Sequence, residues 1–409
     1  MGNKGRRTHG DGALFKRKDG YWVARIELGW DAEGNRLRWQ GVSKTQAGAI
    51  QKMREARTSI LMTGTVPTRS MTLAVWLERW LEEIVKPTVR PMTYQGYLQT
   101  ANKHIEPNLG SITLDRLTPS HVRALHRKVE DASSLGNANM VHRVLRACLS
   151  AAEREGIVPR NVAKLVQTKS SKVTRKALTT AQARLLIAKS GADPLHSRWT
   201  AALLTGARQG EVLGLQWDRV DLEAGTMDIS WQIQAMPYKH GCKGGNDKPT
   251  CGRKAAGHCP NKALDIPSGY EYEHITGAKC LVRPKSSAGL RKIPMPPMLV
   301  DALRKRRRES IATPNPYGFV WTDSAGNPVD PRDDLDAWKA ALAKYDLPVL
   351  PIHSARHTTA TLLMELGVDV TIIQAIMGHS QATTTQGYQH ADLSMARKAL
   401  DDLGSSLAQ

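Results

Sequence analysis

The seven residues from 352 to 358 read Ile-His-Ser-Ala-Arg-His-Thr and carry two side chains suited to a phosphate group. His353 and Arg356 are three positions apart, so on a helix they share one face and can bind one anion together. Arginine offers phosphate oxygens a planar pair of N–H donors, and histidine exchanges protons near neutral pH. Isolated charged residues usually face solvent. The pair therefore indicates an anion site only when similar residues accompany it elsewhere in the chain.

Four further segments supply such residues. They are 205–211 (Thr-Gly-Ala-Arg-Gln-Gly-Glu), 283–289 (Arg-Pro-Lys-Ser-Ser-Ala-Gly), 377–380 (Met-Gly-His-Ser) and 387–390 (Gly-Tyr-Gln-His). In their order and spacing the five segments resemble the catalytic domain of the tyrosine recombinases, the family of phage and mobile-element integrases. The resemblance covers roughly residues 178–400. Ser354 and Ala355 depart from the commoner Asp-Leu between the histidine and the arginine.

The resemblance implies six catalytic residues, which are Arg208, Lys285, His353, Arg356, His379 and the nucleophile Tyr388. Transesterification of a DNA phosphodiester needs a nucleophile, neutralisation of the charge on two non-bridging oxygens, and an acid for the leaving 5′-hydroxyl. The two arginines suit the second task and Lys285 suits the third. A phenol with an ordinary pKa of about 10 must lose its proton during attack, and His353 or His379 can assist that step.

No cofactor is expected for catalysis. A 3′-phosphotyrosine keeps the energy of the phosphodiester, so a second DNA strand can reverse the attack without ATP. The sequence also has no Gly-x-x-x-x-Gly-Lys phosphate loop and no clustered acidic metal triad.

The C-terminal segment leaves two alternatives open. Tyr388 could be a core aromatic, but the threonine run 383–385 and the nearby histidines favour the nucleophile, with His390 as a weaker candidate helper. Residues 393–407 then carry apolar side chains at helical spacing, which are Met395, Ala399, Leu400, Leu403 and Leu407. This helix packs either on its own domain or, as the resemblance suggests, on a neighbouring protomer.

The charge of the chain predicts a polyanionic partner. Its 409 residues include 58 Lys and Arg against 38 Asp and Glu, a formal charge of +20. Residues 1–64 carry +7, residues 65–176 carry +9 and residues 177–409 only +4. Double-stranded DNA fits this surplus, although charge alone also fits RNA or an anionic membrane surface. Because no apolar run is long enough to span a bilayer, we expect no membrane association and a cytoplasmic, DNA-associated enzyme in a bacterial host.

The sequence predicts a multidomain chain. Residues 1–64 indicate a small three-stranded β-sheet plus a helix, capped by Ser43, which we interpret as an arm-type DNA-binding module; a ββα core with solvated charges is the alternative. Residues 65–170 indicate an all-α core-site DNA-binding domain, with four helices near 72–85, 92–106, 119–130 and 137–154. Residues 171–409 indicate a mixed α+β, mainly α, catalytic domain with strands at 227–232 and 279–296.

A cysteine-rich insertion, residues 239–262, interrupts the catalytic domain. Cys242, Cys251 and Cys259 lie among polar residues and glycines that cannot form a core, and a structural zinc ion could organise them with His258, or alternatively His240, as fourth ligand. The spacing is not a paired Cys-x-x-Cys signature, so a flexible basic insert with free thiols is the other interpretation. Cys148 lies in an apolar helix and is expected in the core.

These observations predict a site-specific DNA recombinase that integrates and excises a phage or mobile element through a 3′-phosphotyrosine. The resemblance implies a homo-tetramer on DNA attachment sites and a Holliday junction, with an excision directionality factor and a host DNA-bending protein as candidate partners. A type IB topoisomerase-like strand transferase is one rival, which the N-terminal sheet argues against. A catalytically inactive DNA-binding regulator is the other, which the complete set of six residues argues against.

Overall fold

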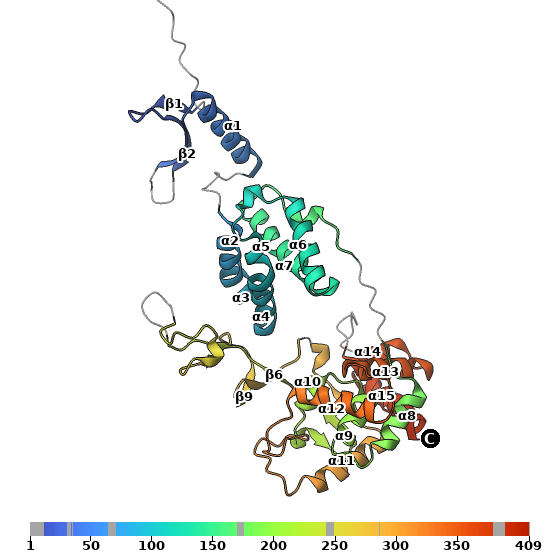
Figure 1. The fold of residues 1–409 in the computed structure, drawn as a ribbon. Helices are drawn as coiled ribbons and strands as arrows, with labels where there is room; N and C mark the ends of the chain where they lie inside the picture. The colour runs from blue at the N-terminus through green and yellow to red at the C-terminus, as the bar shows by residue number, and fades with distance from the viewer. Residues whose placement is uncertain are drawn as a thin grey trace, which may run out of the picture. The chain divides into compact units, whose positions relative to one another are not determined.

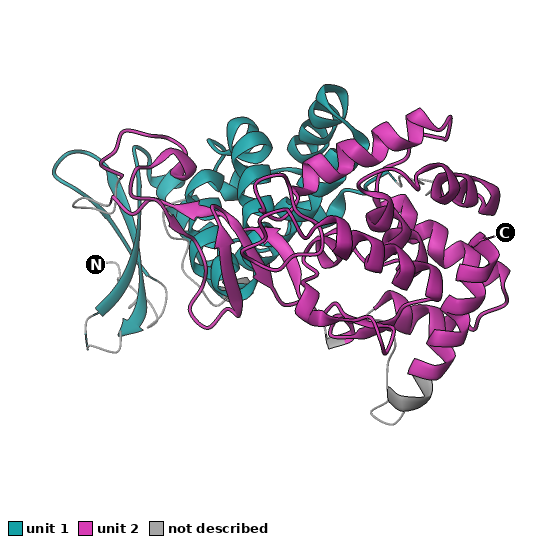
Figure 2. Ribbon diagram, turned by 90° about the horizontal axis from the view of Figure 1, so that it is seen from below, with its two compact units in different colours: residues 1–172 teal, residues 173–409 magenta. Residues whose placement is uncertain are grey.

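The computed structural model describes residues 12–30, 34, 36–63, 71–169, 176–242, 249–285, 287–378 and 389–408. The chain divides into two compact units, residues 1–172 and 173–409, coloured teal and magenta in Figure 2. His379 and Tyr388 lie outside the described residues, so their predicted roles stay predictions. Among the described helices, none combines the length and apolar character that a membrane span requires.

The first unit opens with an antiparallel sheet in the order β1-β2-β3 and a helix. These elements are β1 (Ala13–Lys16), β2 (Trp22–Trp30), β3 (Arg36–Ser43) and α1 (Gln46–Thr63). The helix contacts β2 and β3, and its small buried residues Ala49 and Ala56 permit the close approach. Thr45, and not Ser43 as the sequence suggested, caps the helix, because its hydroxyl accepts the Gly48 N–H at 3.1 Å.

Four long helices follow in the first unit, two of them made of consecutive α- and π-helical parts. Their parts are α2 (Leu73–Arg79), η1 (Trp80–Val85) and α3 (Lys86–Thr88); α4 (Pro91–Thr100), η2 (Ala101–Ile105) and α5 (Glu106–Leu109); α6 (Pro119–Ala132); and α7 (Leu135–Arg154), with 3₁₀ turns η3 (Leu114–Arg116) and η4 (Val162–Leu165). The π-helical stretches η1 and η2 each precede a proline, whose missing N–H disturbs the regular ladder. Cys148 is fully buried, as expected, and its carbonyl accepts the Trp76 indole N–H at 3.1 Å.

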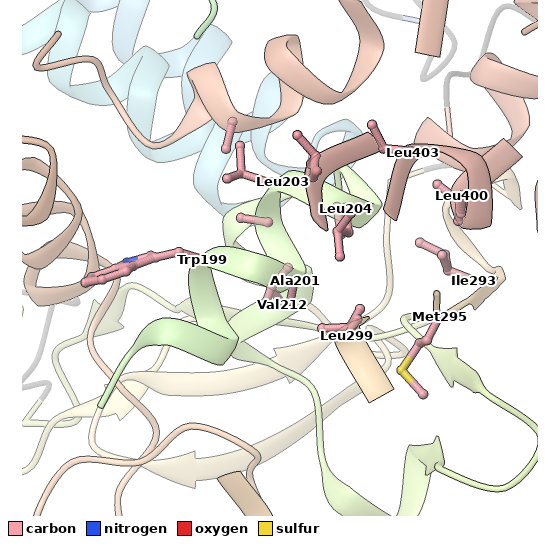
Figure 3. Close-up of a cluster of buried hydrophobic side chains, with 14 of the residues drawn as sticks. Trp199, Ala201, Leu203, Leu204, Val212, Ile293, Met295, Leu299, Leu400 and Leu403 are labelled. Atoms are coloured by element: carbon pink, nitrogen blue, oxygen red, sulfur yellow. The ribbon is translucent and has the colours of Figure 1, made fainter. Parts of the chain in front are cut away.

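The second unit holds eight α-helices in the described part of the chain, together with small sheets. The helices are α8 (Thr180–Lys189), α9 (His196–Thr205), α10 (Gln209–Leu213), α11 (Pro297–Glu309), α12 (Pro331–Lys344), α13 (His353–Glu365), α14 (Val370–Met377) and α15 (Gln389–Ala408). Helix α9 is buried from residue 197 to residue 205. Figure 3 shows its side chains among those of β11, α11 and α15 at the centre of the domain core. Because α9 is buried on all sides, its position in the domain is fixed, and so is the start of the segment that follows it.

The strands of this unit form three separate sheets. Their orders are β11-β5-β4, β6-β10-β9 and β7-β8, from β4 (Val220–Asp221), β5 (Thr226–Asp228), β6 (Gln232–Ala235), β7 (Tyr238–Lys239), β8 (Ala263–Leu264), β9 (Tyr272–Thr276), β10 (Lys279–Val282) and β11 (Lys292–Pro294). Both predicted strand regions, 227–232 and 279–296, contain strands at their two ends, but the two ends of each region belong to different sheets. Short 3₁₀ turns η5 (Trp217–Arg219), η7 (Ala256–His258) and η8 (Ser287–Gly289) complete the unit.

The C-terminal helix α15 packs on its own domain. Leu400 and Leu403 are fully buried, and Figure 3 places them beside Ile293 of β11 and Leu204 of α9. Met395, which the helical spacing placed on the apolar stripe, is instead 51% exposed. Of the two predicted positions of this helix, the structure contains the one within the same chain.

We expect Leu400→Ala to lower the free energy of unfolding of this chain by about 2–5 kcal/mol, because it leaves a cavity in the core. Met395→Ala on the same helix is the matched control and should change it by less than about 0.5 kcal/mol. Urea denaturation followed by circular dichroism measures both. Equal, small effects of the two substitutions would contradict the packing of α15 on its own domain.

Candidate active site

Arg208 lies in the short connection between the central helix α9 and helix α10. Helix α9 ends at Gly206, whose φ of 57° lies in the left-handed region, and a side chain there would come within 2.6 Å of the Met377 sulfur. The Arg208 guanidinium is 40% exposed. Its Nη1 donates to Glu211 Oε1 at 2.7 Å and its Nη2 to the carbonyl of Gly378 at 3.0 Å. Because Gly206 has no side chain, the end of α14 can come close enough for Arg208 to bind the carbonyl of Gly378.

Arg356 reaches the same place from helix α13. Its side chain is buried, with Nη1 donating to the carbonyl of Gly206 at 2.7 Å and Nη2 to that of Met377 at 2.5 Å. Burial lowers the pKa of this guanidinium to about 10, and the charges of Arg208 and Arg291 act in the same direction. Arg356 remains a cation at neutral pH, and a bound anion would relieve the charge repulsion.

Arg291 is a third guanidinium in this group, and the sequence analysis missed it. Its Nε donates to the carbonyl of Ile376 at 2.9 Å, and its Nη2 lies 3.1 Å from Glu211 Oε2. Arg291, Arg356 and Arg208 therefore bind the successive carbonyls of residues 376, 377 and 378, where α14 ends with unpaired acceptors and a partial negative charge. No local pattern distinguishes Arg291 from other cations of its loop, because its contacts come from distant segments.

Glu211 is the carboxylate that joins two of the three arginines, Arg208 and Arg291. It is fully buried and accepts hydrogen bonds from the side chains of Arg208 and Arg291 and from the backbone N–H of Arg208 at 2.8 Å. Burial alone would raise the pKa of this carboxyl, but the Arg291 ion pair and the Arg208 contacts hold the pKa below its usual value. Three guanidiniums and one carboxylate leave the cluster with an excess of two positive charges.

Helix α14 ends at this cluster, and His379 follows the helix in the sequence. It ends at Gly378, whose φ is 64°, and a side chain there would come within 2.5 Å of Arg291 Nη1. The next described residue is Gln389, directly after Tyr388, at the start of α15. Both flanks of the 379–388 segment are thus attached to one domain, and its first flank is bound by three arginines.

Two other predicted residues lie on the surface. His353 is the first residue of α13, exposed, and its ring meets that of His357 edge to face at 4.9 Å. Lys285 is exposed in the turn after β10, and in the described part of the chain no hydrogen bond or ion pair engages its side chain. Two residues earlier, Arg283 lies over the Trp231 ring at 4.0 Å and pairs with Glu271 at 2.8 Å, which anchors the base of the turn.

Comparisons with known proteins identify the family. Residues 72–129 match the family model described as the phage integrase N-terminal SAM-like domain, and residues 278–395 match the phage integrase family model. The chain is 29% identical to an integrase of Saccharopolyspora erythraea, over 98% of this chain and 97% of that protein. The chain belongs to the tyrosine recombinase family. It is a site-specific recombinase that transfers DNA strands and mediates integration.

Further relatives of this recombinase support the same family and fold. The ICEBs1 integrase of Bacillus subtilis is 22% identical over 96% of this chain and all of its own length. The Tn1549 transposon integrase in complex with transposon right end DNA superposes with a TM-score of 0.60 at 20% identity, over 79% of this chain and 99% of that one. A lambda integrase tetramer bound to a Holliday junction gives a TM-score of 0.52 at 16% identity, over 97% of both chains.

A second buried charge pair positions the recombinase's helix α10. Arg198 Nη2 lies 2.8 Å from Asp334 Oδ2, and both side chains are almost completely buried. Gln209, the residue after Arg208, donates to the same oxygen at 2.8 Å and to the carbonyl of Pro331 at 2.7 Å. Because the first residue of α10 is fixed to α12, the backbone of Arg208 has little freedom to move.

The cysteine-rich insertion of the recombinase brings four ligand atoms together. The Sγ atoms of Cys242, Cys251 and Cys259 and the Nδ1 of His240 are the group, and suitable atoms of the four residues lie within 4.8 Å of one another. The Cys242–Cys259 sulfur distance is 3.3 Å, and His240 Nδ1 is 3.5 Å from the Cys251 sulfur. His258 lies in η7 with its side chain exposed and is not in this group. Of the two candidate histidines, the structure therefore brings His240 to the cysteines.

Proposed function

We propose that this recombinase is the integrase of a phage or another mobile element and that Tyr388 forms the 3′-phosphotyrosine. The observation that supports the assignment is the group of guanidiniums on the carbonyls of residues 376–378. Arg208 and Arg356 come from distant segments, yet both bind the end of the helix that leads to His379. A phosphate bound by them lies next to the end of α14, directly before the segment that carries His379 and Tyr388.

Each side chain has a distinct task in the proposed reaction. Arg208 is the more exposed of the two predicted arginines and binds the phosphate from the solvent-facing side of the site. Arg356 is buried and contributes its positive charge from the interior of the domain. Their donors offset the charge that develops on the non-bridging oxygens during attack by the phenolate. His353 and His379 accept or relay the phenolic proton. Lys285, exposed on its anchored turn, gives a proton to the leaving 5′-oxygen.

A nicked duplex that carries the element's end sequence, read from DNA flanking the gene, tests this assignment. The nick lets the cleaved 5′ fragment diffuse away, so the covalent complex accumulates and is visible on a denaturing gel. We expect Arg208→Gln to lower the rate of complex formation at least about 100-fold, as for the loss of a charge-stabilising donor. Arg332→Gln, an exposed arginine of α12, is the matched control. Equal rates for the two variants would contradict the proposed role of Arg208.

We also propose that the chain acts as a homo-tetramer on double-stranded attachment sites. The structural relationship to the lambda integrase, for which a tetramer on a Holliday junction is described, supports this. The assignments of residues 1–64 to arm sites, 65–170 to core sites and 171–409 to catalysis are part of the same proposal. The basic surplus of residues 1–64 and 65–170, +7 and +6, favours DNA contacts by both.

We propose a structural Zn²⁺ site formed by His240, Cys242, Cys251 and Cys259. Around a tetrahedral zinc ion with bonds of about 2.3 Å to sulfur and 2.0 Å to nitrogen, neighbouring ligand atoms are about 3.5–3.8 Å apart. The separations of 3.3, 3.5 and 4.0 Å among these residues in the structure are close to that geometry. The ion would provide the order that the insertion cannot obtain from an apolar core.

Elemental analysis of the untagged, reduced protein tests the metal site. We expect one Zn²⁺ per chain, and the loss of most of it in Cys251→Ser and in His240→Ala. His258→Ala is the matched control and should keep the metal, because that side chain lies outside the group. Zinc-free wild-type protein, or a metal content that follows His258 instead of His240, would overturn the assignment.

A further inference from the structure

The positive charge of the catalytic region is concentrated in the insertion. Residues 239–262 contain six Lys and Arg and one Asp. The other residues of 177–409 contain 21 basic and 22 acidic side chains and are close to neutral. The recombinase therefore carries its catalytic-domain surplus on one segment of 24 residues.

The cations of the insertion are available to a ligand. Lys239, Arg253, Lys254 and Lys262 are all exposed, and among the described residues none of them forms an ion pair with a carboxylate. Lys262 donates to the carbonyl of Gly257 at 3.1 Å and lies over the Tyr238 ring, contacts that orient its stem and leave its charge uncompensated. We call these four side chains the insertion cations.

The insertion has a firm attachment to the domain. Strands β7 and β8 close its neck, and the buried residues Met236, Cys280 and Val282 pack with Leu264 and Ile266 at its base. Figure 1 shows this segment, in yellow, extending from the helical body of the domain next to β6 and β9. Strand β10, which carries Cys280 and Val282, leads directly to Lys285. The base of the insertion is thus packed against the strand that leads to the predicted general acid.

The surface chemistry points to a nucleic acid and not to a protein. Protein interfaces are anchored by buried aromatic and aliphatic side chains. Within the described residues of 239–262 there is no exposed large hydrophobic side chain. A surface of uncompensated cations without apolar anchors matches the phosphate backbone of a duplex, which is bound mainly by Lys and Arg.

We propose that the insertion cations bind DNA phosphates and give the catalytic domain a contact to the duplex beyond its active site. The inference rests on the proposed function for the identity of the substrate. The zinc ion would hold these cations in a fixed arrangement, which reduces the entropy lost when they bind the backbone. Such contacts raise affinity on every sequence alike and strengthen as the salt concentration falls.

The test replaces all four insertion cations with glutamine in the full chain, with Tyr388→Phe also present so that cleavage does not disturb the binding measurement. The matched control removes four exposed cations from α11 and α12 of the same domain, Arg308, Arg332, Lys339 and Lys344. Fluorescence anisotropy with a labelled duplex of mixed sequence gives the affinity at several salt concentrations. Zinc content, by elemental analysis, shows whether the insertion of each variant keeps its structure.

We expect the slope of log affinity against log salt to fall by about two to three for the insertion variant, at about 0.9 per phosphate contact, with affinity at least about 10-fold lower in ~0.1 M salt. The control should lose less than half as much. An unchanged slope in a variant that keeps its zinc overturns the inference. Equal losses in both variants also overturn it, since net charge then explains the binding. Failure of the wild type to form a covalent complex overturns the proposed function and leaves this binding result standing.

Discussion

Tyr388→Phe should abolish the covalent protein–DNA complex and leave DNA binding unchanged. The substitution removes only the phenolic oxygen, so the ring can still pack and the arginines still hold the phosphate. Without an attacking oxygen, no ester forms, and the rate of complex formation should fall by more than about 10⁴-fold. The nicked duplex described above, run on a denaturing gel, measures the complex. A gel shift on the uncut duplex measures binding.

Tyr345→Phe is the matched control for this prediction. Tyr345 follows the end of α12 in the same domain and packs against the main core, so it reports the effect of losing a hydroxyl that has no role in the reaction. It should keep full complex formation. A Tyr388→Phe protein that still forms the complex would reassign the nucleophile, and peptide mapping of the labelled adduct would then identify the residue that carries the DNA.

Part of the proposed active site could be predicted from sequence because its motifs are local. His353 and Arg356 lie on one turn of α13, and Arg208 follows the glycine that ends α9; both relations follow from helix geometry. Arg291 could not be found in this way. Its importance comes from contacts with Glu211 and the carbonyl of Ile376, which lie about 80 residues away on each side.

The fold shows the same division between local and distant interactions. Helix α8 starts at a capping box of Thr179 and Gln182, and such a start is a local signal because both partners lie within one turn. Residues 227–232 and 279–296 were predicted to form strands because both segments are rich in β-forming residues. Each is divided in the structure because pairing partners, which the sequence does not display, assign its two ends to different sheets.

The fourth ligand of the insertion's proposed metal site could not be predicted from sequence either. Spacing alone did not identify the fourth ligand: His258 was the predicted one and His240 the alternative, and both lie close to a cysteine in the sequence. The neck formed by β7 and β8 resolves the choice by placing His240 directly after β7 and near the Cys251 sulfur. Tertiary pairing of two very short strands, and not a motif, therefore decides which imidazole is available to a metal.

Glu211→Gln should destabilise the second unit by about 3 kcal/mol or more, because it leaves Arg291 and Arg208 without their buried carboxylate. Urea denaturation measures this loss. Glu309→Gln is the matched control, since Glu309 is half exposed and 3.8 Å from Lys305, and should change stability by less than about 0.5 kcal/mol. The ion pairs hold the pKa of Glu211 below its usual value, so their contribution is complete above the ordinary glutamate pKa of about 4.3. It is lost as the pH falls through the lower, folded-state pKa, and the stability difference between wild type and Glu211→Gln should shrink in that range.

The same substitution should slow formation of the covalent complex by at least about 100-fold, because a displacement of about 1 Å in a positioned group is enough for such a loss. Arg291→Met provides the second measurement, since Arg291 binds Glu211 and the end of α14 without being one of the six predicted catalytic residues. If Glu211 acts through the arginine cluster, the losses of the two single variants will not add in the double variant. Additive losses would show that Glu211 and Arg291 act independently, and a fully active Glu211→Gln enzyme would show that the cluster does not position the site.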